Sequence, residues 1–272
     1  WTVYADNWLT VSTFPTAAQI DGYTHFILAF WISDKGPVDN GLSWARMSTT
    51  QRRKLKQRLT SGGAKLMIAA GGATDHPTTA GLGPEKRAQL LANYVKRYGF
   101  DGVDVNYEDF AAFNANDGRA ERWVIRFTRE LRKQLPSHEI SHGPVAPLFQ
   151  PNRWGGGGYL RINNEVGGLI NFYNIQFYNQ GDDIYTSCYQ IMERSHPAVP
   201  NTSVFQMIRN RVPGEKIVVG KPAGAKDASN GFYSAPALGS CLRKYAGRNG
   251  YQGSAMVWQW ANAGRAWVHT VR

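Results

Sequence analysis

Residues 101–108 read Asp-Gly-Val-Asp-Val-Asn-Tyr-Glu, a strand-like stretch in the middle of the chain. Because side chains alternate along a strand, its apolar residues share one face, which suits packing beneath helices. The other face carries Asp104, Asn106 and Glu108. Burying carboxylates is costly unless they are paired and hydrogen-bonded, so a polar line on an inner face indicates function. The alternative is a solvated edge strand with its polar side chains outward.

Further strand-like runs flank this stretch, at 2–6, 24–31, 65–70, 139–147, 171–178, 216–220 and 253–260. Helical periodicity is clearest over 84–98 and 119–135, where Pro84 suits a first turn and Pro136 marks an end. Strands that alternate with helices indicate a parallel sheet, and 272 residues suit a closed (β/α)8 TIM barrel. A doubly wound open sheet is the competing fold, but Asp6-Asn7-Trp8 offers no Gly-rich phosphate loop.

The composition predicts one folded domain over residues 1–272. Hydrophobic residues make up 42% and charged residues 19%, which supports a sizeable core and argues against disorder. The net charge of +11 invites a nucleic-acid partner, but the basic residues follow helical segments such as 51–58 and 119–133, as on solvated faces. No apolar run approaches the roughly 20 residues that span a bilayer. We therefore expect a monomer with no nucleic-acid or membrane partner.

Two other strands offer side chains for a site at the C-terminal mouth of the barrel, where such active sites lie. Along 172–179, one face carries Asn174, Gln176 and Tyr178. In the last strand, one face carries Met256, Trp258 and Trp260. A tryptophan at the floor of a pocket can stack on a sugar ring, and simple core filling is the equal alternative for Trp258.

These stretches together resemble glycoside hydrolase family 18, the chitinases and chitinase-like proteins, and most closely its compact secreted fungal members. The family signature on the fourth strand is D-G-x-D-x-D-x-E, and residues 101–108 match every defined position except Asn106. Other stretches resemble the second, third, sixth, seventh and eighth strands of the family, at 23–30, 69–72, 176–179, 216–222 and 253–258. The resemblance implies the barrel without an inserted α+β domain, because the segment from Lys221 to Ser234 is too short for one.

The resemblance also implies a mechanism. Chitin, a β-1,4-linked N-acetylglucosamine polymer, is cut with retention, and the substrate's own acetamido oxygen is the nucleophile. Glu108 is implied as the general acid, Asp104 as its support, Tyr178 as the donor that holds the acetamide, and Trp258 as the sugar platform. Further substrate-binding positions by the same match are Gln176, Asp101, Gly71, Gly72 and Phe30. No cofactor and no metal is implied.

Asn106 stands where the family carries Asp. An Asn can still accept a hydrogen bond from the acetamide, but it brings no charge to stabilise the cationic oxazolinium intermediate. Loss of one preorganised catalytic group commonly costs on the order of 10²–10³ in rate. The residue fits a slow or retuned enzyme, a chitin-binding pseudoenzyme, or an engineered Asp→Asn change. The presence of Glu108, Tyr178 and Trp258 favours an active lineage.

Three functions therefore remain open. The first is an endo-acting chitinase with an open, shallow cleft, weakened by Asn106. The second is a catalytically silent binder of chitin oligomers. The third is an endo-β-N-acetylglucosaminidase that acts on N-glycans by the same chemistry.

Two features point to a secreted, extracellular or cell-wall protein. Cys188 and Cys241 are the only cysteines, and both fall in outer segments of consecutive strand–helix units, so we expect a disulfide between them. Asn201-Thr202-Ser203 is a sequon for N-glycosylation of Asn201. The chain starts at Trp1 without a signal-peptide pattern, as a mature secreted protein would.

Overall fold

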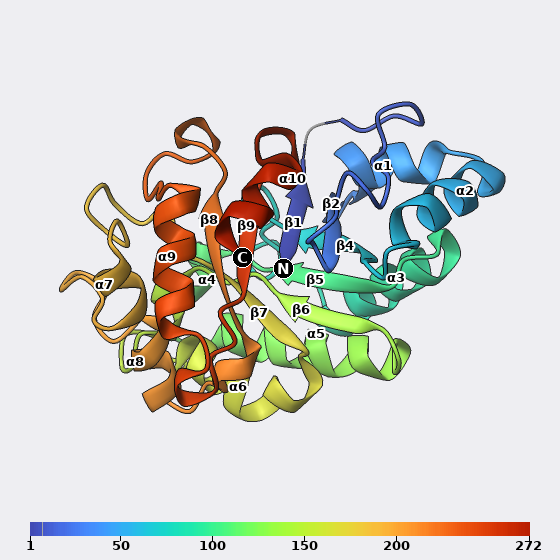
Figure 1. Cartoon of the computed structure of the whole chain (residues 1–272). Helices are drawn as coiled ribbons and strands as arrows, with labels where there is room; N and C mark the ends of the chain where they lie inside the picture. Colours follow the sequence, from blue (N-terminus) through green and yellow to red (C-terminus); the bar gives the residue numbers. More distant parts are fainter. Residues whose placement is uncertain (7) are drawn as a thin grey trace.

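The fold is a closed barrel of eight parallel strands, seen in a computed structural model that describes residues 1–6 and 8–272. The barrel strands are β1 (Thr2–Ala5), β2 (His25–Ile32), β4 (Lys65–Gly71), β5 (Gly102–Asn106), β6 (Glu139–His142), β7 (Phe172–Gln176), β8 (Ile217–Pro222) and β9 (Ala255–Trp258). They pair in chain order, and β1 pairs with both β2 and β9, which closes the barrel (Figure 1). The short β3 (Gly36–Pro37) lies antiparallel to the end of β2. The expected TIM barrel is therefore confirmed.

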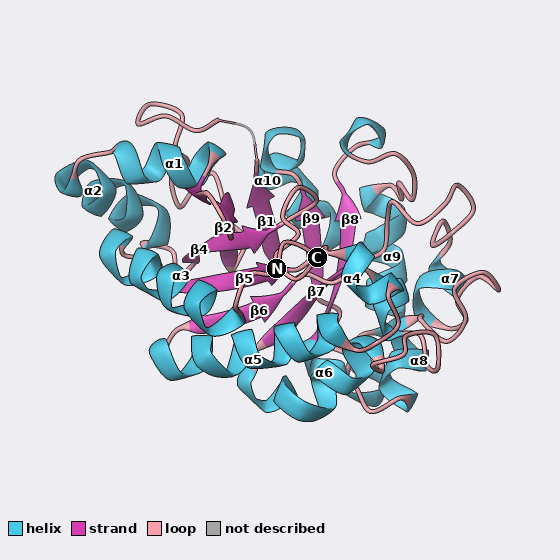
Figure 2. Cartoon of the chain, turned by 180° about the vertical axis from the view of Figure 1, so that it is seen from behind, coloured by secondary structure: helices cyan, strands magenta, loops and turns pink. Residues whose placement is uncertain are grey.

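Helices form an outer layer around the strands (Figure 2). They are α1 (Asp39–Arg46), α2 (Thr49–Thr60), α3 (Pro84–Tyr98), α4 (Phe110–Asn114), α5 (Arg119–Gln134), α6 (Gly158–Val166), α7 (Cys188–Met192), α8 (Val204–Arg209), α9 (Ala235–Tyr245) and α10 (Trp260–Val271). Short 3-10 turns complete the connections: η1 (Ala146–Phe149), η2 (Gly167–Leu169), η3 (Gly214–Lys216), η4 (Ala225–Asp227) and η5 (Arg248–Gly250). No helix among residues 1–6 and 8–272 is long and apolar enough to cross a membrane.

Local sequence explains the two helices that were predicted most clearly. α3 begins at Pro84, whose fixed φ suits a first turn, and it ends at Tyr98, because the left-handed backbone of Gly99 (φ 75°) terminates the helix. α5 begins at Arg119 and buries the apolar stripe of Val124, Phe127 and Leu131. These stripes pack on the outward face of the strands, where Val103 and Val105 belong to the main apolar core.

The last predicted strand is partly wrong. β9 stops at Trp258, and Trp260 begins α10 instead of continuing the strand. The ring of Trp260 therefore leaves the barrel interior and packs edge-on against Tyr23 and Phe26 in the outer layer. Met256 and Trp258 remain inside, in a cluster with Tyr4 and Tyr178.

Other boundaries also differ from the expected pattern. Residues 8–24, after β1, form turns and no helix, although each strand was expected to precede one. Asn7, in the stretch after the first strand, lies outside the described residues. The chain passes from β8 to α9 through residues 223–234, with only η4 between them, so this part of the described chain holds no inserted α+β domain.

A disulfide joins Cys188 in α7 to Cys241 in α9 and so ties together the outer helices that follow β7 and β8. The sequon lies close by, before α8. The side chain of Asn201 is exposed, whereas Thr202 is buried and its hydroxyl donates to the carbonyl of Val199 (2.5 Å). The exposed Asn201 is accessible for glycosylation, which stays a prediction.

Candidate active site

The polar face of β5 points into the barrel. Strand register sets Asp104 opposite Ala69 and Ser141, and Asn106 opposite Gly71, so small residues of β4 and β6 flank the line. Tyr107 points the other way and packs its ring against Phe113 and Trp123 beneath the helices. The alternation read from residues 103–108 thus holds, although β5 itself ends at Asn106.

Asp104 is the buried base of the site, with no solvent exposure. Its Oδ2 accepts a hydrogen bond from the Tyr4 hydroxyl (2.6 Å). Its Oδ1 accepts from the Ser141 hydroxyl (2.6 Å) and from Nδ2 of Asn174 (2.9 Å). Burial raises the pKa of Asp104 above its ordinary value, and these three donors oppose that rise because they favour the ionised form. Asp104 is therefore a fully hydrogen-bonded support below the pocket.

The next layer joins Asn106 and Glu108 through Gln176. Nε2 of Gln176 lies within hydrogen-bond distance of Oδ1 of Asn106 (3.0 Å), Oε1 of Glu108 (3.1 Å) and the carbonyl of Gly143 (2.8 Å). With its amide turned over, Asn106 instead donates to Gly143 O (2.8 Å) and to Oε1 of Glu108 (3.2 Å). The turned amide meets both acceptors, and the ionised Asp of the family signature has no N–H to do the same.

Glu108 lies just beyond β5, at the C-terminal mouth. Burial raises the pKa of its carboxyl, and the hydrogen bond from Gln176 partly opposes the rise. The following residue, Asp109, fixes this turn: its buried carboxylate accepts from the backbone N–H of Thr79 (2.7 Å) and caps α4 through Ala112 N (3.2 Å). A carboxyl with a raised pKa can hold a proton for transfer at higher pH than an ordinary Glu.

A solvent-open hollow of about 370 Å³ lies above this line, a size within the range of ligand pockets. Its walls include the expected residues Phe30, Gly71, Gly72, Asn106, Glu108, Gln176, Tyr178 and Trp258. Trp258 pairs in register with Tyr4 and Pro222 and packs against the ring of Phe30 (6.0 Å between centroids). Burial raises the pKa of Tyr178 well above its ordinary value, so its hydroxyl stays a hydrogen-bond donor.

Gly71 brings two strands unusually close at this mouth. Its φ is +101°, and a Cβ there would lie 2.2 Å from the carbonyl oxygen of Asn106. That same carbonyl accepts a hydrogen bond from the Gly72 N–H (2.7 Å). The Gly71-Gly72 pair therefore holds the backbone of Asn106 in place, and any larger residue at 71 would displace it.

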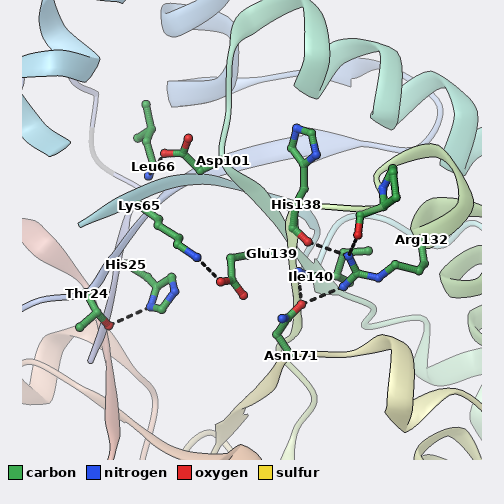
Figure 3. Close-up of polar contacts among 11 residues, drawn as sticks. Thr24, His25, Lys65, Leu66, Asp101, Arg132, His138, Glu139, Ile140 and Asn171 are labelled. Atoms are coloured by element: carbon green, nitrogen blue, oxygen red, sulfur yellow. Dashed lines mark hydrogen bonds and ion pairs between the residues drawn. The ribbon is translucent and has the colours of Figure 1, made fainter. Parts of the chain in front are cut away.

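Asp101 does not belong to this pocket, and its expected substrate-binding position is wrong. It precedes β5, so it lies at the N-terminal end of the barrel, where its carboxylate accepts from Leu66 N (2.9 Å) and pairs with Lys56. Figure 3 shows Asp101 there beside Leu66, in the same region as Glu139 and Asn171. Its role in the shared Asp-Gly motif is to join strands, not to meet a ligand.

Sequence reasoning missed four residues that shape the site. Tyr4 and Ser141 donate to Asp104, Gly143 makes room above it, and Asp109 anchors the turn after Glu108. Alternation along residues 2–6 puts Tyr4 on the opposite face from Val3 and Ala5, a signal that was available. The other three depend on contacts between elements far apart in sequence.

The arrangement suits proton transfer to a neutral, hydrogen-bonding ligand. It offers one acid of raised pKa, amide groups from Asn106 and Gln176, a phenol donor, and the face of Trp258. Among residues 1–6 and 8–272, no group of three or more His, Cys, Asp or Glu side chains is placed to hold a metal ion.

Known proteins share this fold and sequence pattern. The chain is 25% identical over 200 residues to a chitinase of Enterococcus faecalis, covering 68% of this chain and 55% of that protein. It is 23% identical over 261 residues to endochitinase 1 of Metarhizium robertsii, covering 83% of this chain and 59% of that protein. The chain thus matches only a little over half the length of these two relatives.

Solved structures agree at the level of fold. A GH18 chitinase from Pseudoalteromonas aurantia superposes with a TM-score of 0.77 at 24% identity, covering 99% of this chain and 97% of that one. Chitinase ChiC from Aspergillus fumigatus gives a TM-score of 0.69 at 19% identity, covering 96% and 91%. The sequence model of glycosyl hydrolases family 18 matches residues 1–268, nearly the whole chain, and the protein therefore belongs to glycosyl hydrolases family 18.

Proposed function

We propose that this chain is a chitinase-type glycoside hydrolase that cuts β-1,4-linked N-acetylglucosamine polymers by retaining, substrate-assisted catalysis. The observation that carries the proposal is the meeting of Glu108, Asn106, Tyr178 and Trp258 in one hollow at the C-terminal mouth of the barrel. Membership of family 18 supports the reaction class, and the names of the relatives support chitin as the substrate.

The proposed reaction starts with a protonated Glu108. Its carboxyl gives its proton to the glycosidic oxygen, while the acetamido carbonyl oxygen of the substrate attacks C1 and the C1–O bond breaks. The Tyr178 hydroxyl donates to that acetamido oxygen and holds it in line. The resulting oxazolinium ion is then opened by water at C1, with the ionised Glu108 accepting the water's proton, so configuration at C1 is retained.

Asn106 would tune this reaction. It can accept from, or donate to, the polar groups around the acetamide, but it adds no negative charge near the oxazolinium cation. In its turned orientation it also donates to Glu108, which favours the ionised form of the acid. Both effects slow the reaction, so we propose an enzyme of reduced rate. The same residue favours the second candidate, a silent binder of chitin oligomers.

The deciding experiment compares chitin-oligomer cleavage by the natural chain, Asn106→Asp and Glu108→Gln. We expect the natural chain to cleave slowly, Asn106→Asp to cleave about 10²-fold faster, and Glu108→Gln to be inactive. The matched control is Asn171→Asp, which adds the same charge at the N-terminal end, where Asn171 accepts from Ile140 N (2.9 Å). This control should leave the rate unchanged.

Other outcomes separate the candidates. Cleavage only by Asn106→Asp would indicate an intact site silenced at one position, and oligomer binding without cleavage by either chain would favour the binder. A glycoprotein assayed in parallel would reveal an endo-β-N-acetylglucosaminidase. We further propose that residues 1–272 act as one secreted catalytic domain, in line with its disulfide, because disulfides persist in oxidising environments.

A further inference from the structure

A lysine without solvent exposure lies beside the pocket, and nothing in the proposed reaction uses it. Lys221 is the penultimate residue of β8 and is 0% exposed. Val218, on one face of β8, belongs to the cluster inside the barrel, and alternation puts Lys221 on the opposite face with Val219. Its side chain therefore runs between the barrel and the outer layer. A buried ammonium is costly, so its retention there calls for a reason.

The ammonium is fully occupied by backbone carbonyls. Nζ of Lys221 donates to the carbonyls of Phe177 (2.6 Å), Tyr185 (2.6 Å) and Gly231 (2.9 Å). No carboxylate of the described residues forms an ion pair with it. Burial lowers the pKa of Lys221 to about 7, whereas three carbonyls favour the charged form, because only the ammonium has three N–H groups. In acidic solution all three bonds are available.

The three carbonyls belong to the two loops that follow β7 and β8, on either side of the backbone of Tyr178. Phe177 directly precedes it, Tyr185 lies in the loop after β7, and Gly231 lies in the loop after β8. A Cβ at Gly231 would be only 2.7 Å from Cα of Tyr178, so the second loop packs directly on the tyrosine backbone. Further bonds join the same two loops, from Asn179 N to Asn230 O (3.1 Å) and from Ser229 N to Oδ1 of Asn179 (2.7 Å).

The position of Tyr178 depends on these contacts to its backbone. Its hydroxyl has no hydrogen-bond partner among the described residues, which leaves it available to a ligand in the hollow. The ring direction is therefore set by its backbone and by packing, not by an anchor at the hydroxyl end. The backbone on either side of Tyr178 is held by Lys221 and by the Asn179–Asn230 contact.

We infer that Lys221 is a positioning residue, whose ammonium holds the loops after β7 and β8 together and thereby aims the Tyr178 hydroxyl at the substrate's acetamido group. The inference rests on the proposed function for the role of Tyr178. The bonds that position the loops are visible without any substrate, so the two claims can fail separately.

The test removes the ammonium and measures order and catalysis separately. Lys221→Met keeps the length of the side chain and abolishes all three bonds. The matched control is Lys216→Met at the end of η3, directly before β8, where Nζ donates to the carbonyls of Gly167 (2.6 Å) and Ile170 (2.7 Å). Amide hydrogen exchange is followed in peptides over 177–187, 223–234 and 167–171. Kinetics on a chitin oligomer give kcat and KM.

We expect Lys221→Met to speed exchange in 177–187 and 223–234 alone, and to lower kcat by about 10- to 100-fold with KM little changed, because a group displaced by about 1 Å can cost that much. Lys216→Met should affect only 167–171 and leave kcat unchanged. Unaltered exchange in both loops, or a normal kcat in Lys221→Met, would overturn the inference.

Two complications have their own readouts. If Lys221→Met does not fold, Lys221→Gln retains two N–H donors, and we expect intermediate exchange and an intermediate kcat; full protection in Lys221→Gln would count against the role. If the natural chain cleaves no oligomer, the proposed function fails, and the exchange comparison alone still decides whether Lys221 orders the loops around Tyr178.

Discussion

At the scale of single residues, the site depends on which groups hold protons. Asp104 accepts three hydrogen bonds, whereas Glu108 meets only amide donors and stands at the mouth of the hollow. This difference suits Asp104 to a fixed supporting role and Glu108 to proton transfer. Two carboxyls on the same inward face can take these different roles because burial acts on both, while the number of hydrogen bonds differs.

Glu108 sets the first prediction, the pH profile. Burial raises its pKa above the ordinary value of 4.5. In the proposed reaction the protonated form of Glu108 is the active acid. The value of kcat/KM should therefore be high below that raised pKa and fall as pH increases through it, so the alkaline limb reports Glu108. Initial rates on a soluble oligomer from acidic to neutral pH measure the limb. A limb at or below 4.5 would contradict the assignment.

Gly143 supports a second prediction. A Cβ at this position would lie 2.9 Å from Oδ1 of Asn106, 3.1 Å from Oδ2 of Asp104 and 3.2 Å from the Tyr4 hydroxyl. Gly143→Ala should push the polar line out of place and lower kcat by about 10- to 100-fold while the fold persists. Gly168→Ala is the matched control, since a Cβ there meets nothing within 4 Å. Equal kcat in the two variants would show that Asp104 and Asn106 can be displaced without loss of activity.

At the scale of elements, the sequence predicts strands and periodic helices well and their ends poorly. The helical pattern over 84–98 has the bounds of α3, because Pro84 and Gly99 mark both ends locally. The strand-like run predicts a last strand over 253–260, whereas β9 ends at Trp258, the last residue that pairs with β1 and β8. Such ends depend on packing between distant elements, which no local pattern contains.

The candidate site follows the same division. Alternation along two strands puts their pocket residues on the inward face, so a sequence argument can find them: Asn106 and Glu108 in and just after β5, and Gln176 and Tyr178 in and just after β7. Asp101 belongs to the same motif, but it precedes β5. It therefore lies at the N-terminal end of the barrel, one strand length away from the pocket at the C-terminal mouth. Ser141 lies opposite Asp104 through the pairing of β6 with β5, and Gly143 is placed by a hydrogen bond from its N–H to the carbonyl of Val105 (2.9 Å). Both contacts are tertiary, so no local pattern contains them.

The α7–α9 disulfide gives a prediction at this scale. Cys188 and Cys241 are 53 residues apart, so their bond closes a long loop that contains all of β8 and restricts the unfolded chain. The double variant Cys188→Ala/Cys241→Ala should lose about 2–4 kcal/mol in free energy of unfolding, measured by urea titration. Thiol titration of the unfolded, unreduced natural protein should find no reactive thiol. Two reactive thiols, or an unchanged urea midpoint, would contradict the prediction.

At the scale of the whole molecule, the open side of the barrel decides how a polymer can lie. The chain runs from β8 to α9 through residues 223–234 with only the short η4, and this loop is committed to packing on Tyr178. It therefore builds no wall over the hollow, which stays open to solvent above Glu108 and Trp258. If the substrate is a polymer as proposed, a long chain could cross such a cleft without threading an end, so we expect cuts within chains.

The product pattern tests this openness directly. On a long soluble chitin derivative, we expect viscosity to fall before much reducing sugar appears, and early products of mixed length, because random internal cuts shorten chains before they release small fragments. Size analysis of the first few per cent of product measures this, with Glu108→Gln as the blank for handling losses. Dimers alone from the earliest samples would mean that chains are cut from one end, and the loop at 223–234 would then have to shape a closed subsite that an open cleft does not provide.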